Sequence, residues 1–191
     1  MKKSIIAIAI LSAMGSTAAF AEPTVGATGT INFTGHINAN SCTVASKSAN
    51  VTSNGGNITV DMGTVAADVL GTEAQPAVGG VGGKLAQSLT LELTCMEGTS
   101  VDLKLTRQVA SGKGIGLQPG GAQNVQVMLV NENTNLPLDF TSGSVTLSAD
   151  LVGGYTTFPL MAYYSKSAGK LAADVVPGVA NATVNYELSY D

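Results

Sequence analysis

The stretch T-V-N-Y-E-L-S-Y-D, Thr183 to Asp191, decides the fold. Its apolar residues occupy every second position and therefore share one face of an extended strand; they are Val184, Tyr186, Leu188 and Tyr190. A strand with one apolar face must lie on a hydrophobic core. Because nothing follows that could cover its far side, we expect this last strand to have an exposed edge.

The rest of the sequence has the pattern of an all-β protein. It contains 23 glycines and no tryptophan, and only 12% of its residues are charged. Short alternating segments are separated by turn signals, which is typical of a sandwich or barrel. We predict strands at 34–44, 58–65, 85–95, 101–105, 125–130, 138–140, 145–149, 156–164 and 183–190. Between them we predict a loop at 47–57, a long connection at 66–83 with a helical turn near 66–70, turns at 112–121 and 131–137, and a loop at 168–179. Pro159 should lie at a sheet edge or a bulge.

The first 21 residues have the features of a secretory signal peptide. Lys2 and Lys3 precede an apolar run at 5–14 that is too short to cross a bilayer, and Ala19-Phe20-Ala21 fits a cleavage site. We expect cleavage before Glu22, although a retained anchor helix is the alternative. Loss of the two lysines makes the formal charge two units more negative than −4. An acidic chain without a basic cluster argues against nucleic acid or anionic lipid as a partner.

Two cysteines, Cys42 and Cys95, remain after cleavage. Export places them in an oxidising compartment, so we predict one disulfide between them. Such a loop stabilises the fold by about 4 kcal/mol in the chain-entropy treatment. Two buried free thiols are the alternative. A redox or metal site has less support, because the sequence has no C-x-x-C pair and no nearby histidine.

The segment after the cleavage site is a second strand pattern. Val25, Ala27, Gly29, Ile31 and Phe33 alternate with small or polar residues. Two glycines give the segment little reason to fold locally, and its apolar face needs a groove that receives it. The alternative is a frayed terminus that merely begins the first strand.

Taken together, these features resemble the subunits of chaperone–usher fimbriae, and in particular the type 1-like major pilins. The resemblance covers nearly all of the exported chain. The features that carry it are the glycine fourteenth from the end, Gly178; the alternating final strand with the penultimate aromatic Tyr190; the motif G-T-I-N-F-T-G at 29–35, followed seven residues later by Cys42; the cysteine pair; and the run F-P-L-M-A-Y-Y at 158–164.

The resemblance implies an all-β, incomplete immunoglobulin-like β-sandwich that lacks its last strand and is completed by a donor strand from another subunit. Residues 1–21 would be the signal peptide, 22–34 the donor-strand extension and 35–191 the pilin domain. Val25, Ala27, Gly29, Ile31 and Phe33 would be the donor residues, with Gly29 opposite a shallow pocket. The strand beside the acceptor groove, which the chaperone contacts first, would include Gly178, Val184, Tyr186, Leu188 and Tyr190.

In function, the resemblance implies a structural subunit of a surface fimbria that supports adhesion. Its partners would be identical or related pilin subunits, a periplasmic chaperone, an outer-membrane usher and, in some cases, a host receptor. The chain would pass through the periplasm to the bacterial surface. A minor or adaptor pilin, a major subunit that itself binds a receptor, and a secreted monomeric binding sandwich are the alternatives.

No catalytic set is evident in the sequence. His36 is the only histidine, so a Ser–His–Asp triad would have to use it, and no G-x-S-x-G motif occurs. The glycine-rich stretch at 79–83 is followed by Lys84-Leu85, which is not a phosphate-binding loop. We therefore expect no enzymatic activity, no cofactor and no metal.

Overall fold

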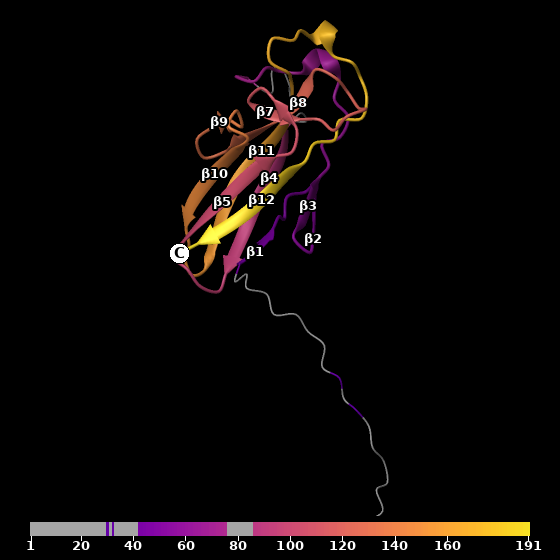
Figure 1. Cartoon of the computed structure of the whole chain (residues 1–191). Coiled ribbons are helices and arrows are strands. Elements are labelled where there is room, and N and C mark those ends of the chain that lie inside the picture. The colour runs from indigo at the N-terminus through magenta and orange to yellow at the C-terminus, as the bar shows by residue number, and fades with distance from the viewer. Residues whose placement is uncertain (1–29, 31, 33–41, 76–85) are drawn as a thin grey trace, which may run out of the picture. The chain divides into compact units, whose positions relative to one another are not determined.

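The computed structural model describes residues 30, 32, 42–75 and 86–191 (Figure 1). The chain divides into two units, Met1–Ile37 and Asn38–Asp191, and the strands below all lie in the second unit. No helix among these residues is long and apolar enough to cross a membrane.

Strands build the second unit, with two short 3-10 helices. The strands are β1 (Cys42–Ala45), β2 (Val51–Asn54), β3 (Asn57–Val60), β4 (Ala86–Cys95), β5 (Ser100–Arg107), β6 (Ala110–Ser111), β7 (Gly114–Gly116), β8 (Val125–Asn131), β9 (Leu136–Pro137), β10 (Ser144–Asp150), β11 (Tyr155–Lys166) and β12 (Val184–Tyr190). The helices are η1 (Ala67–Val69) and η2 (Ala172–Asp174). The η1 helix confirms the predicted helical turn.

The strands form two main sheets and one separate hairpin. The larger sheet runs β1-β4-β11-β8-β7-β6, with β9 beside β8, and the smaller sheet runs β10-β5-β12. Among the strands that the structure describes, β2 and β3 pair only with each other. The facing sheets enclose one core, which confirms the predicted all-β sandwich. Its most deeply buried apolar side chains are Leu93, Val101, Leu103, Ile115, Phe140 and Leu160.

Period-2 alternation predicted the main strands correctly. In β5, Val101, Leu103 and Leu105 are buried, whereas the residues between them are exposed. The apolar face of β4 lies against the same core, with Leu91 and Leu93 buried. Strand β8 differs, because residues on both of its faces are buried, including Gln126. The side-chain nitrogen of Gln126 is tolerated in this buried position because it donates hydrogen bonds to Glu73 and to the carbonyl of Lys166.

Cys42 and Cys95 form the predicted disulfide. They are also cross-strand partners in the β1–β4 ladder. The disulfide therefore ties the start of β1, the outermost strand on this side of the larger sheet among the described residues, to the end of β4.

The predicted loop at 47–57 and strand at 58–65 were wrong in part. The structure has a hairpin, β2–β3, and the strand ends at Val60. The turn of the hairpin is Asn54-Gly55-Gly56-Asn57, in which the two glycines have φ of 57° and 86°. Positive φ at both central residues is the geometry of a two-residue hairpin turn whose twist matches that of the strands. The polar composition hid this turn signal.

Two further predictions need correction. The turn region at 112–121 contains β7, whose Ile115 is buried and pairs with Val127 of β8. The predicted strand at 138–140 is irregular, although Leu138 and Phe140 are buried. Each of them donates a single backbone hydrogen bond instead of joining a ladder. Leu138 N–H donates to the Leu129 carbonyl, and Phe140 N–H donates to the Lys113 carbonyl. In the sequence, the apolar residues Leu138 and Phe140 at alternate positions therefore resembled a strand, although their backbone is irregular.

Pro159 lies in β11, which is a central strand and not an edge. The β11–β8 ladder begins one residue later, at Leu160–Asn131, so β11 has only β4 as a ladder partner at the proline. The Pro159 carbonyl accepts from Glu132 N–H in the turn after β8. The missing N–H of proline thus falls where one ladder ends, which is why a central strand tolerates it.

Candidate functional site

Within the part of the chain that the structure describes, strand β12 has a partner on one side only. It pairs antiparallel with β5 from Val184–Arg107 to Tyr190–Val101. No other strand among the described residues pairs with its opposite edge. The alternation predicted for this strand is confirmed, since Val184, Tyr186 and Leu188 pack against the core and the residues between them are exposed.

The hydrogen bonds at the two ends of β12 fix the direction in which its backbone groups point. The Thr183 carbonyl accepts from Gln108 N–H, and Asp191 exchanges backbone bonds with residues 99 and 100. In an antiparallel pair, residues bonded to the neighbour alternate with residues whose N–H and C=O point away from it. The backbone groups of Val184, Tyr186 and Leu188 therefore point to the open edge. This is a row of strand-pairing groups that a further strand can use.

A groove of about 1320 Å³ lies along the first half of this edge. Its floor is apolar and comes from both sheets, with Leu105 of β5, Ile115 of β7, Leu129 of β8 and Leu160 of β11. One flank is β12 and the segment before it, 175–186, and the other flank is the segment 57–67. Ile58, Met62 and Val65 of this second flank pack against the core.

A hydrogen bond joins the two flanks. The Tyr186 hydroxyl donates to the Gly56 carbonyl at 2.6 Å, although the two residues are 130 positions apart. The turn glycine allows this approach, because a Cβ on Gly56 would lie 3.2 Å from the Tyr186 hydroxyl oxygen. The aromatic ring of Tyr186 thus spans the groove between β12 and the hairpin.

We expect Tyr186→Phe to loosen this bridge. Loss of the hydroxyl should lower the free energy of unfolding by about 0.5–1.5 kcal/mol, the typical net value of one hydrogen bond. It should also speed the insertion of a peptide strand, since the flanks need no longer be parted. Stopped-flow binding of a labelled peptide measures the rate and urea unfolding the stability. Slower insertion would show that the bridge holds the groove open.

Gly178 lines the groove but lies before β12 rather than within it. Its backbone packs on the loop at 121–122, where the Ala122 N–H donates to the Val179 carbonyl at 2.8 Å. A Cβ on Gly178 would lie 2.8 Å from the Ala122 nitrogen, and a Cβ on Gly121 would lie 2.0 Å from the Val179 oxygen. The two glycines therefore permit a close approach of two backbones that sets the direction in which the chain enters β12.

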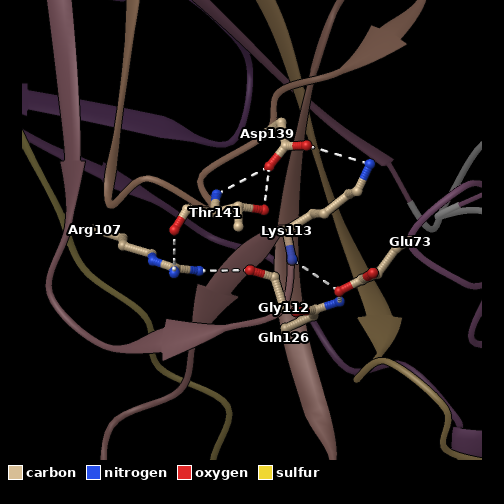
Figure 2. A network of polar contacts seen from close by, with 7 residues as sticks. All are labelled: Glu73, Arg107, Gly112, Lys113, Gln126, Asp139 and Thr141. Atoms are coloured by element: carbon tan, nitrogen blue, oxygen red, sulfur yellow. Dashed lines mark hydrogen bonds and ion pairs between the residues drawn. The ribbon is translucent and has the colours of Figure 1, made fainter.

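A polar network supports the floor of the groove from the side of β7 (Figure 2). Arg107 donates to the carbonyls of Gly112 and Gly114, both at 2.8 Å. Glu73 accepts from Lys113 N–H at 2.8 Å and from the Gln126 side chain at 3.1 Å. These contacts hold the β6–β7 turn against β8, next to the floor residue Ile115.

Asp139 belongs to the same network. The hydroxyl and backbone N–H of Thr141, together with Lys113, lower the pKa of Asp139 to about 2. A carboxylate with a depressed pKa stabilises the fold above its ordinary pKa of about 4, and this contribution is lost as the pH falls from there through 2.

Thr141→Val should therefore raise the pKa of Asp139 toward its ordinary value, because the hydroxyl makes the largest contribution to the shift. The carboxyl carbon of Asp139, followed by NMR from pH 6 to pH 1.5, reports this directly. An unchanged titration midpoint would contradict the assigned cause.

The other predicted site residues lie outside the described part of the chain. These are the donor residues Val25, Ala27, Gly29, Ile31 and Phe33; His36, for which no site role was predicted, lies outside the described residues as well. Of the predicted groove strand, the structure places Val184, Tyr186 and Gly178 at the groove, while Leu188 and Tyr190 continue β12 beyond it. Sequence reasoning missed the flank at 57–67 and the hydrogen bond from Tyr186 to the carbonyl of the preceding residue, Gly56. Among the described residues, no group of three or more His, Cys, Asp and Glu side chains could hold a metal ion.

An open-edged, immunoglobulin-like sandwich is the class of fold that these observations define. No protein-family model matches the sequence, and no curated protein matches it. Among solved structures, the P pilus rod subunit PapA aligns with a TM-score of 0.52 and 20% identity, covering 79% of this chain and 99% of PapA. The fold of this chain is thus similar to that of a pilus rod subunit, which confirms at the level of fold the resemblance inferred from the sequence.

Two further solved structures are similar over part of the chain. The type I fimbria protein and antigen of Burkholderia pseudomallei aligns with a TM-score of 0.48 and 20% identity, covering 78% of this chain and 99% of that one. The CupB6 tip adhesin of Pseudomonas aeruginosa aligns with a TM-score of 0.45 and 18% identity, covering 54% of this chain. The alignment spans only 30% of the length of the adhesin.

Proposed function

We propose that this protein is a structural subunit of a surface fimbria that polymerises by donor-strand exchange. In this proposal the groove beside β12 accepts the alternating segment Val25 to Phe33 of a neighbouring subunit. The observation that carries the proposal is the open edge of β12 above an apolar groove. The pilus-rod fold of the chain supports it.

The groove suits a peptide strand better than a small molecule. Its volume of about 1320 Å³ exceeds the range of about 300–1,000 Å³ that is usual for small-molecule sites. The outward backbone groups of β12 would pair with an added strand, and alternate side chains of that strand would reach the floor. Burial of Ile31 and Phe33 there would contribute roughly 1.5–3 kcal/mol each.

Assembly would need helper proteins, because an unfilled apolar groove with an open strand edge invites aggregation. A periplasmic chaperone would fill the groove first, and an outer-membrane usher would exchange its strand for that of the next subunit. The residues 1–21 would direct export, 22–34 would act as the donor and 35–191 would form the pilin domain. The contact is head to tail and does not close on itself, so it propagates a filament. The protein in this proposal is not an enzyme, and it acts at the bacterial surface.

The register of the donor strand can be tested at Gly29, which shares a face with Ile31 and Phe33. Replacement of Gly29 by Leu should clash with a shallow part of the groove, at a cost of about 1–3 kcal/mol. Strand exchange in vitro should therefore slow, while the subunit and its chaperone complex remain intact. Thr28→Leu, on the opposite face, is the matched control and should have the milder effect. Equal rates for the two variants would mean that the face or the segment is wrong.

A minor or adaptor pilin uses the same groove and donor segment, and so does a major subunit that also binds a receptor. Size-exclusion chromatography of native material separates these from a monomeric binding sandwich. A series of oligomers or filaments supports the interpretation that the protein is a pilin. A stable monomer that persists without any chaperone supports the alternative, a secreted monomeric binding sandwich.

A further inference from the structure

Two groups of exposed apolar side chains lie at opposite ends of the unit Asn38–Asp191. At the end where β4 and β10 finish, Met96 is 90% exposed, Val152 80% and Tyr155 44%. We call these three residues the cap. At the other end, the connection from β11 to β12 carries Leu171, 70% exposed, Val176, 46%, and Val179, 66%. We call these three residues the crown.

Backbone hydrogen bonds tie together the two turns that carry Met96 and Val152. Cys95 N–H donates to the Gly154 carbonyl at 2.7 Å, and Leu151 N–H donates to the Thr99 carbonyl at 2.9 Å. These bonds join the turn after β4, which carries Met96, to the turn after β10, which carries Val152. Large exposed apolar side chains that gather at one end of a domain are candidates for an interaction surface.

The crown is also fixed in place. Ala122 N–H donates to the Val179 carbonyl, and Gln123 and Val176 exchange backbone hydrogen bonds in both directions. The connection is therefore tied to the segment before β8. Because β11 runs from Tyr155 to Lys166 and β12 returns from Val184 to Tyr190, the crown and the cap lie at opposite ends of these two strands (Figure 1).

The point where the N-terminal segment joins the domain limits how far the cap lies from the accepting subunit. Strand β1 begins at Cys42, whose cross-strand partner Cys95 directly precedes Met96. Residues 34–41, which separate the donor segment from Cys42, can span at most about 30 Å. Under the proposed function, on which this inference rests, the subunit that accepts Phe33 therefore lies within that distance of the cap.

The direction of the donor strand determines which end of the accepting subunit lies near the cap of the donating subunit. The ladders in both sheets are antiparallel, so we expect the donor strand to run antiparallel to β12. The C-terminal end of such a donor strand lies beside the start of β12, where the crown is. We propose that the cap of each subunit packs against the crown of the copy that accepts its donor strand, forming a second contact besides the inserted strand.

The charges near the two surfaces are compatible with this contact. The strand ends and turns around the cap carry Glu97, Asp150 and Asp191, all exposed, and residues 95–100, 149–155 and 188–191 include no Lys or Arg. Exposed Lys170 lies next to Leu171 in the crown. Its neighbour Asp174 is engaged locally, since its carboxylate accepts from Leu171 N–H at 2.8 Å.

The test places a photoreactive benzoylphenylalanine at Val152 in the full chain, in polymers isolated from producing cells. The expected result is a crosslink to the 171–179 segment of a second copy, located by mass spectrometry. A probe at Leu136, which is 63% exposed and lies in β9, outside both groups, is the control and should not give this crosslink. With the probe moved to Leu171, the double change Met96→Ser and Val152→Ser should reduce crosslinking to the cap by roughly tenfold, because two apolar side chains no longer become buried.

Polymers that form normally but give no crosslink from Val152 to 171–179, or give the same crosslink from Leu136, overturn this inference and leave the proposed function intact. A chain that never assembles, and whose groove binds no peptide of residues 22–33, overturns both. Because Met96 and Val152 are almost fully exposed in the single subunit, their replacement by serine should not impair folding, and far-UV circular dichroism of the variants checks this.

Discussion

A chain that lacks Glu22 to Phe33 is expected to form no filaments, while its groove still accepts those residues as a separate peptide. The reason is that the segment carries an alternating apolar face and precedes the first strand of the domain, whereas the groove is built from residues 57–186. Removal of the donor should therefore leave the acceptor unchanged. Electron microscopy of surface material from cells that produce only the truncated chain measures the outcome.

The matched control is a chain in which residues 22–33 are replaced by a Gly/Ser-rich segment of the same length. It keeps the spacing to Cys42 but lacks the apolar face, so it too should fail to polymerise. Filaments of normal abundance from either chain would mean that subunits associate through another surface. Filaments from the Gly/Ser chain alone would mean that the length of the segment matters and its side chains do not.

The second large effect is expected from loss of the disulfide. Replacement of both Cys42 and Cys95 by serine should lower the free energy of unfolding by about 4 kcal/mol, because the unfolded chain regains the entropy of the open loop. Cys95 is also buried, so a serine there adds a polar group at a buried position. Urea unfolding of the purified subunit with a bound donor peptide gives the value, and the yield of exported protein should fall with it.

Reduction of the unmodified protein by dithiothreitol is the control that separates the crosslink from the substitutions. It should produce most of the loss seen in the double variant. Equal stability of the oxidised and reduced forms would show that the loop is already constrained in the unfolded chain, and free thiols in non-reduced peptide maps would show that the disulfide does not form in the cell.

The sequence predicted the longer strands, including β8 and β11, although residues on both faces of β8 are buried. Alternation found β4, β5, β10 and β12 because each of these strands has one face on the core and the other in solvent. It failed for β7 and for residues 138–140, whose burial depends on other segments that cover them. Ile115 is covered through pairing with β8, and Phe140 is held by a single bond to the Lys113 carbonyl.

Only one of the two flanks of the groove could be predicted from the sequence. The flank at β12 follows from its apolar alternation, but the flank at 57–67 does not, because its place depends on a contact between Tyr186 and Gly56 that are far apart in the chain. The Asn54-Gly55-Gly56-Asn57 signal for the hairpin was present in the sequence and was outweighed by the polar residues around it. Gly178, which the sequence pattern singled out, lies before β12, and its backbone packs closely against Ala122.

Amide hydrogen exchange at β12 tests the central claim most directly. A subunit without residues 22–33 is measured alone and then with a synthetic peptide of that sequence. We predict that the amides of Val184, Tyr186 and Leu188, which point to the open edge, gain protection when the peptide binds. Those of Asn185 and Glu187, which already face β5, should change little. Peptide binding without added protection at Val184, Tyr186 and Leu188 would contradict the account, because the segment would then bind somewhere other than the edge of β12.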